Sequence, residues 1–243
     1  WTYKYEEAAR QGAAAALIIH DTLPAAYDWQ VVRNGWSKPQ FHADAADGHA
    51  GRSAIEGWIT NARAAQLMEL AGLDLATLQA AAVQRGFRPV PLGVTATAGV
   101  RNVIRRAKSP NIAGVMPGKD RPDEYVIYVA HWDHFGRALA FTGDTIFNGA
   151  VDNATGVAGI LTIARAYREM IPGPSRSVMF LAVTAEESGL IGSEHYAKHP
   201  LVPLEKTAAV INIDALNPLG RARDIEVIGF GASQLEDFLA KAA

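Results

Sequence analysis

The second part of the chain alternates long apolar runs with segments whose apolar residues recur at helical spacing. The apolar runs predict strands at residues 124–131, 176–185, 208–214 and 224–231. After the first run, the helical segment places Val157, Ile160, Leu161, Ala164 and Tyr167 on one face. Buried strands that alternate with helices predict an α/β fold, in which a mostly parallel central sheet is flanked by helices on both faces.

The first part of the chain has shorter and more mixed patterns. In chain order they predict a helix before Gly12, a strand at 14–20, a surface loop at 34–52, two helices ending at Gly72 and Gly86, and a strand at 89–100. Because the last strand leads away from this module, we place a domain boundary near residue 93. We therefore expect a small domain at 1–93 and a larger one at 94–243.

Composition and charge exclude several classes of protein. The formal net charge is −2, so no basic surface indicates binding to nucleic acid or to an anionic membrane. The chain has no cysteine, which excludes disulfides, thiolate zinc ligands and cysteine nucleophiles. No apolar stretch reaches the roughly 18 residues that would predict membrane insertion. The opening residues, WTYKYEEAARQG, contain neither an initial methionine nor a signal peptide, and we expect the true N-terminus to be missing.

Acidic and imidazole side chains follow three of the predicted strands and precede the predicted helix. They are His131, Asp133 and His134 after the first strand, Asp152 before the helix, Glu186 and Glu187 after the second strand, and Asp214 at the third. Because ligands bind beyond the carboxyl ends of strands in open α/β sheets, we expect these side chains to share one edge. Most are carboxylates, and buried charges are paired or bind metal.

Mixed histidine and carboxylate ligands favour zinc, or less specifically manganese or cobalt. One metal needs three or four ligands, whereas two metals about 3.5 Å apart need a bridging carboxylate. Neighbouring residues at a strand end point in different directions, so one of Glu186 and Glu187 would bind metal and the other would work beside it. Each residue alone has a structural explanation, such as helix capping for Asp152. The metal hypothesis depends on finding all of these residues together at successive strand ends.

Four segments carry a family resemblance: VAHWDH, NGAVDNATGVAGIL, TAEESGLIGSEHY and NIDALNPLG, in this order. Together they resemble the co-catalytic zinc exopeptidases, which include bacterial and vacuolar aminopeptidases, glutamate carboxypeptidase II and the transferrin receptor. The resemblance covers about residues 94 to 243. Residues 1 to 93 resemble the C-terminal part of a protease-associated domain, on the weaker basis of GAAAALIIHD and the pattern that follows it.

The resemblance implies a role for each site residue. The metal ligands would be Asp152, which bridges two Zn²⁺ ions, His131 and Asp214 on one ion, and Glu187 on the other. Glu186 would be the general base, which takes a proton from the attacking water and passes it to the leaving amine. Asp133 would orient His131. The resemblance also implies a cis peptide bond between Asp152 and Asn153, a peptide substrate, and a secreted or periplasmic location.

One ligand of the family pattern is missing from this chain. The second zinc of the family takes a histidine from a later segment, and the chain ends at QLEDFLAKAA, a predicted helix, before that point. We expect His134 to line the pocket or to pack locally, and His195 and His199 to be a helix end. The chain is therefore expected to be a truncated piece that the C-terminal remainder of the same polypeptide completes.

Other functions fit parts of the same sequence. VAHWDH partly matches a metallo-β-lactamase signature, but Val129 stands where that signature has histidine. Glutaminyl cyclase-like chemistry and a glutamate-releasing carboxypeptidase remain alternatives on the same fold, as does an inactive pseudo-peptidase that only binds. There is no Gly-x-Ser-x-Gly elbow of a serine hydrolase. The sequence favours a zinc-dependent exopeptidase, most of all an aminopeptidase.

Overall fold

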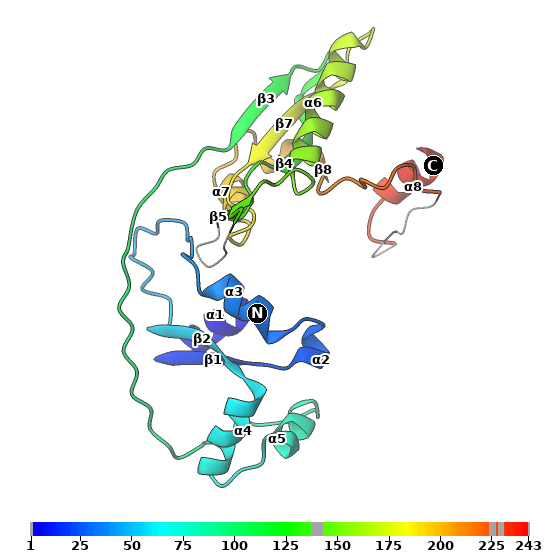
Figure 1. The fold of residues 1–243 in the computed structure, drawn as a ribbon. Helices are drawn as coiled ribbons and strands as arrows, with labels where there is room; N and C mark the ends of the chain where they lie inside the picture. The colour runs from blue at the N-terminus through cyan, green and yellow to red at the C-terminus, as the bar shows by residue number, and fades with distance from the viewer. Residues whose placement is uncertain (1, 138–142, 224–226, 228–230, 243) are drawn as a thin grey trace. The chain divides into compact units, whose positions relative to one another are not determined.

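A computed structural model of the protein describes residues 2–137, 143–223, 227 and 231–242. The chain forms two compact units, Trp1–Ser109 and Pro110–Ala243, each with its own internal contacts. The second unit contains the sheet that carries the candidate site (Figure 1). Among the described residues, no helix combines the length and the apolar character needed to cross a membrane.

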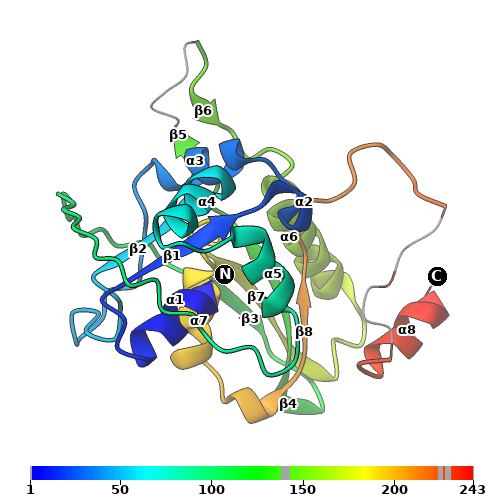
Figure 2. The same ribbon diagram turned by 90° about the horizontal axis from the view of Figure 1, so that it is seen from below.

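The second unit is built on a mixed, mostly parallel sheet of four strands. The strand order is β3 (Ile112–Met116), β7 (Arg176–Val183), β4 (Arg121–His131) and β8 (Thr207–Asn212). Strand β4 runs parallel to β7 and to β8, while the edge strand β3 is antiparallel to β7. Figure 2 shows β8 beside β4 from below. Three strands therefore end at the same edge.

Helices cover both faces of this sheet, as the apolar strands predicted. On one face, Ile127 and Met179 form a buried cluster, and Tyr196 of α7 (Ile191–Lys198) packs against it. On the other face lies α6 (Ala154–Glu169), where the Tyr167 ring packs against Tyr128. Strand residues alternate between these two helices because successive side chains point to opposite faces.

Shorter elements complete the second unit. They are the hairpin strands β5 (Gly136–Arg137) and β6 (Ile146–Phe147), the 3₁₀ helix η1 (Leu204–Lys206) and the terminal helix α8 (Leu235–Ala242). The helix predicted for the chain end is thus present. The predicted strand at 224–231 falls largely outside the described residues.

The first unit contains a two-stranded parallel sheet and several helices. Its elements are α1 (Thr2–Arg10), β1 (Ala15–His20), α2 (Thr22–Ala25), α3 (Trp29–Trp36), β2 (Ile55–Thr60), α4 (Asn61–Leu70) and α5 (Leu75–Ala82). The side chains of Thr60 and Asp74 cap α4 and α5 by accepting hydrogen bonds from backbone N–H groups. The two helices predicted before Gly72 and Gly86 are confirmed.

The strand predicted at 89–100 is wrong. Residues 87–111 form no helix or strand, and the predicted boundary near residue 93 lies inside this irregular segment. Pro89 and Pro91 cannot donate backbone hydrogen bonds to a neighbouring strand. The alternation of apolar and polar residues was therefore not enough to predict a strand here. Strands β2 and β3 were not predicted. Each contains a glycine, Gly57 and Gly114, which interrupts the apolar pattern.

Candidate metal centre

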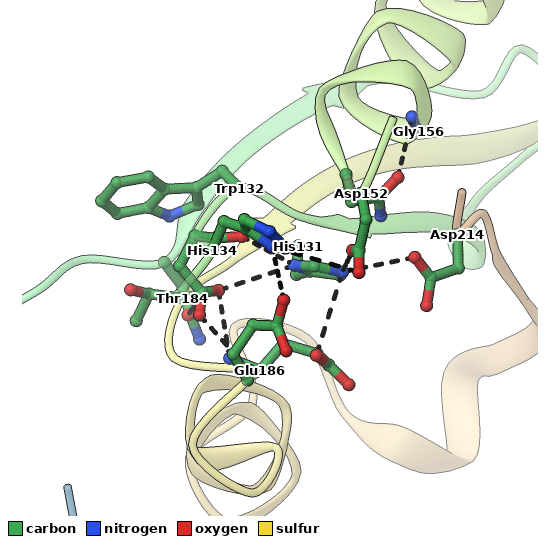
Figure 3. Close-up of polar contacts among 12 residues, drawn as sticks. His131, Trp132, His134, Asp152, Gly156, Thr184, Glu186 and Asp214 are labelled. Carbon is green, nitrogen blue, oxygen red and sulfur yellow. Dashed lines mark hydrogen bonds and ion pairs between the residues drawn. The ribbon is translucent and has the colours of Figure 1, made fainter. Parts of the chain in front are cut away.

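His131 lies at the centre of the site, at the last position of β4. Its register partner is Val183, the last residue of β7, so the two strands end side by side. The ring is 4% exposed and its Nδ1 atom lies 3.0 Å from the backbone oxygen of Asp133. That contact directs Nε2 towards the carboxylates in Figure 3, whereas Trp132 points away from them.

Asp152 enters the site because its neighbour caps the helix. The N-cap of α6 is Asn153, whose side chain accepts a hydrogen bond from the Gly156 N–H at 2.9 Å. The capping role considered for Asp152 is therefore wrong. Its Oδ1 atom lies 3.0 Å from His131 Nε2. The Asp152–Asn153 peptide bond is cis, as the resemblance implied.

The two adjacent glutamates point to different partners, as the strand-end argument predicted. Glu187 Oε1 lies 2.6 Å from His134 Nδ1, and Glu186 Oε2 lies 3.9 Å from His131 Nε2. The carboxylate of Asp133 accepts hydrogen bonds from both glutamate N–H groups, at 3.0 and 3.4 Å. Asp133 therefore connects the end of β4 to the turn after β7.

Asp214 reaches the site from the segment after β8. Its Oδ1 atom lies 3.3 Å from His131 Nε2 and accepts a hydrogen bond from the Ala215 N–H. This segment is held against the start of α6, because the Asn153 side chain donates to the Ile213 carbonyl at 3.0 Å. Asn153 therefore positions both Asp152 and Asp214.

Two groups of potential ligands result, and they share Asp152. One consists of His131, Asp152 and Asp214, and the other of His134, Asp152 and Glu187. The ligand atoms within each group all lie within 4.8 Å of one another. A carboxylate shared by two such groups is the arrangement expected of a site for two metal ions.

The charges of the site are poorly balanced by the protein alone. Burial raises the pKa of the Glu186 carboxyl, and the charge of the nearby His131 offsets only part of that rise. Burial and the charge of Asp152 raise the pKa of Glu187. Burial acts to lower the pKa of His131, but the Asp133 carbonyl and the carboxylates of Glu186 and Asp214 raise it overall. A bound cation would compensate this excess of carboxylates.

Unsatisfied atoms also fit a metal. Among the described residues, His134 Nδ1, Asp152 Oδ1 and Glu187 Oε1 are buried and make no hydrogen bond of regular geometry, although His134 Nδ1 lies 2.6 Å from Glu187 Oε1 and Asp152 Oδ1 lies 3.0 Å from His131 Nε2. Buried polar atoms usually have a partner, and these three converge on one place. Nitrogen and carboxylate oxygen donors suit zinc. The residues present therefore fit a metal centre.

The structure brings together all six residues singled out by the sequence: His131, Asp133, Asp152, Glu186, Glu187 and Asp214. It adds His134, which was expected to line the pocket or to pack locally. The spacing of His134 from His131 could have indicated a second imidazole ligand, since both follow the same strand. Only the turn after β4 places it beside Glu187.

Comparisons with known proteins agree on one family. The profile of Peptidase family M28 matches residues 111–243. Aminopeptidase NAALADL1 of Mus musculus is 35% identical over 137 residues, which is 53% of this chain and 17% of that protein. A glutamate carboxypeptidase 2 homolog of Caenorhabditis briggsae is 30% identical over 129 residues, or 51% and 15% of the two chains. The chain thus spans less than a fifth of the length of these relatives.

Solved structures include a zinc aminopeptidase, BSAP, from Bacillus subtilis. It is 30% identical, with a TM-score of 0.35 over 43% of this chain and 24% of that chain. Because the family profile covers more than half of the sequence, the protein belongs to Peptidase family M28.

Proposed function

We propose that the protein is a zinc-dependent exopeptidase and that it acts as an aminopeptidase. The observation that carries this proposal is the pair of ligand groups that share Asp152, with Glu186 beside them but in neither group. His131, Asp152 and Asp214 would hold one ion, and Glu187 would contribute to the second. Bound zinc supplies Lewis-acid chemistry, since it polarises a carbonyl and makes water a better nucleophile at neutral pH.

Glu186 would act as the general base. Its carboxylate accepts a proton from the attacking water as the water oxygen forms a bond to the scissile carbonyl carbon. The same group then donates this proton to the nitrogen as the carbon–nitrogen bond breaks, which releases a free amine and a carboxylate. This exchange needs a carboxylate beside the ligands that is not itself a ligand, and Glu186 Oε2 lies 3.9 Å from His131 Nε2 but belongs to neither ligand group.

Asp133 would position the base and the ligand together. Its hydrogen bonds to the Glu186 and Glu187 N–H groups hold the turn, and the carbonyl of the same residue contacts His131 Nδ1. A metal-binding histidine usually has its second ring nitrogen bonded in this way, which fixes the tautomer and the ring orientation. Asp133 is a positioning residue in this proposal.

The relatives favour two specificities, an aminopeptidase and a glutamate carboxypeptidase, and their names differ on this point. The test uses the protein stripped of metal with a chelator and reloaded with zinc. We expect zinc-dependent release of p-nitroaniline from leucine p-nitroanilide and none from its N-acetyl form. Cleavage only of an N-blocked dipeptide ending in glutamate would favour the carboxypeptidase. Bound zinc with no cleavage of any substrate would overturn the proposal.

A further inference from the structure

An asparagine outside the metal centre joins the two ends of the turn at residues 184–192, the glutamate turn, which carries the two adjacent glutamates. Asn111 stands just before β3, and its Oδ1 atom accepts a hydrogen bond from the Thr184 N–H at 3.0 Å. Its Nδ2 group donates to the Gly192 carbonyl at 2.8 Å. Thr184 follows the last residue of β7, and Gly192 lies in the first turn of α7. One side chain therefore bridges the beginning and the end of the glutamate turn.

The pairing of β3 with β7 does not account for these two bonds. The last paired residues of the two strands on this side are Ile112 and Ala182. Beyond that pair, the planar amide of Asn111 presents one donor and one acceptor, as a backbone peptide group does. The Asn111 side chain therefore takes the place of a further strand residue between the end of β7 and α7.

The base of the glutamate turn is packed closely around this amide. The Gly192 N–H donates to the Thr184 carbonyl at 3.0 Å, so the two residues bond to each other as well as to Asn111. A Cβ atom at Gly192 would collide with that carbonyl and lie 2.7 Å from Asn111 Oδ1. A side chain at this position would therefore push the three groups apart, whereas glycine lets them meet.

The glutamate turn contains backbone that needs support from its surroundings. Ala185, which directly precedes Glu186, has a φ of +53°, and Leu190 has a φ of +62°. Residues with a Cβ atom rarely adopt this left-handed conformation, which costs free energy unless the surrounding structure imposes it. The conformation of Ala185 orients the Glu186 N–H, which donates to Asp133. Loss of the Asn111 bonds should therefore release the backbone that orients Glu186.

Asn111 is itself anchored to the segment that follows β4. The Trp132 indole N–H donates to the Pro110 carbonyl at 3.2 Å, which explains why the ring points away from the carboxylates in Figure 3. The Trp132 backbone N–H donates to the Val183 carbonyl at 3.0 Å. Because Trp132 directly follows His131, the peptide group that precedes Asn111 is tied to the segment that carries the central ligand.

We infer that Asn111 is a positioning residue for the proposed general base, because its side-chain amide joins the ends of the glutamate turn and so fixes Glu186 beside the metal centre. This inference rests on the proposed function and deepens it. Asn111 acts through the turn and not through contact with substrate or metal. The turn is held at two places, since Asp133 accepts hydrogen bonds within it and Asn111 closes its ends.

The first experiment compares Asn111→Ala with Ser177→Ala, which is a matched control. Ser177 is 2% exposed, and its Oγ atom likewise accepts from a backbone N–H, that of Gly118, and donates to a carbonyl, that of Pro122. It lies near the start of β7, roughly 23 Å along the strand from Thr184. Both variants lose the same two kinds of hydrogen bond, but only Asn111→Ala loses them at the glutamate turn.

Hydrogen exchange of the metal-free proteins, followed by mass spectrometry, tests the role of Asn111 without any turnover. We expect Asn111→Ala to accelerate exchange in peptides from the glutamate turn by more than about tenfold relative to peptides from α6 of the same variant. Ser177→Ala should leave this ratio at its wild-type value. An unchanged ratio in Asn111→Ala would overturn the inference.

Steady-state kinetics at saturating zinc provide the second readout, with the bound metal counted on the same preparation. We expect Asn111→Ala to lower kcat by roughly 10–100-fold, because a small displacement of Glu186 misaligns it with the attacking water. KM should stay within about threefold of the wild-type value, since the contacts to substrate remain. Ser177→Ala should keep the wild-type kcat. Equal losses of kcat in the two variants, or a raised KM with unchanged kcat, would contradict the positioning role.

Asn111→Asp provides a milder variant in case the alanine variant does not fold. Aspartate keeps an acceptor for the Thr184 N–H but turns an oxygen towards the Gly192 carbonyl. Its readout is hydrogen exchange, because the added charge also acts on the carboxylates of the site. Exchange in the glutamate turn should again be faster than in the wild type, and wild-type exchange would count against the inference.

Failure of the proposed function would look different from failure of this inference. If the zinc-loaded wild type cleaves no substrate, the proposed function fails, while the exchange ratio still decides whether Asn111 holds the turn. If the wild type is active and Asn111→Ala changes neither the exchange ratio nor kcat, the inference alone fails.

Discussion

The carboxylate of Asp133 accepts a hydrogen bond from the backbone N–H of Glu186, at 3.0 Å. Through this bond, the segment that ends β4 fixes the turn that ends β7, and the proposed base is attached to the same residue whose carbonyl contacts His131. The geometry of the base and of the central ligand is therefore coupled. A substitution of Asp133 should therefore alter the positions of both Glu186 and His131.

Replacing Asp133 with asparagine should weaken metal binding without abolishing it. The amide keeps one acceptor oxygen but replaces the other with a donor that faces a backbone N–H group. We expect a loss in zinc affinity of about 10–100-fold, measured by competition with a chelating dye. Asp120→Asn is the control, because Asp120 is exposed and precedes β4 at the end opposite the site. Equal affinities of the two variants would contradict the positioning role.

Replacing Glu186 with glutamine should separate binding from catalysis. Glu186 belongs to neither ligand group, so the variant should keep its bound zinc. Loss of the base should lower kcat by roughly 10²–10⁴-fold with a much smaller change in KM. Metal content and steady-state kinetics on the same preparation provide the test. If zinc is lost instead, the roles assigned to Glu186 and Glu187 are reversed.

Replacing Asp152 with asparagine should remove metal from both groups. Asp152 is the one residue that the two groups share, and the change removes a negative charge from each. We expect zinc affinity to fall more than about 100-fold at both sites. The fold should survive because the helix cap is Asn153. Elemental analysis with circular dichroism checks both points, and two retained ions would exclude a bridging role.

Zinc should stabilise the metal-free protein against heat. The carboxylates of the site repel one another in the folded chain and are brought together only there, so the metal binds the folded state. At a free zinc concentration 100 times Kd, one site contributes about 2.7 kcal/mol. Scanning calorimetry should show the transition rise with zinc and return with a chelator. Asp152→Asn should show no such rise, and a zinc-independent wild-type transition would contradict the metal centre.

Two glycines of α6 should respond in opposite ways to alanine. A Cβ at Gly156 would collide with the Asn153 side chain and lie 2.6 Å from the Ile213 carbonyl, whereas the nearest atom to a Cβ at Gly159 lies 3.6 Å away. Gly156→Ala should therefore destabilise the fold and displace Asp152. Gly159→Ala should stabilise it by up to about 1 kcal/mol through helix propensity. Chemical denaturation measures both, and equal effects would contradict the close approach at Gly156.

Much of the second unit could be predicted because its signals are local. The continuous apolar runs of β4 and β7 and the helical spacing of α6 each specify one type of element without help from the rest of the chain. The carboxylates and His131 could be assigned to one edge, since parallel strands end together. The edge strand β3 could not be predicted in this way, because it has only five residues and Gly114 interrupts its apolar pattern.

The sequence by itself determined that strands ending in histidine and carboxylates alternate with helices, and that four motifs follow the order of one peptidase family. Tertiary structure decided which atoms meet. It selected Asn153 rather than Asp152 as the cap of α6, turned Glu186 and Glu187 towards different histidines, and placed His134 beside Glu187. These outcomes depend on the register of strands far apart in the chain and on turn geometry, which the periodicity of apolar residues does not encode.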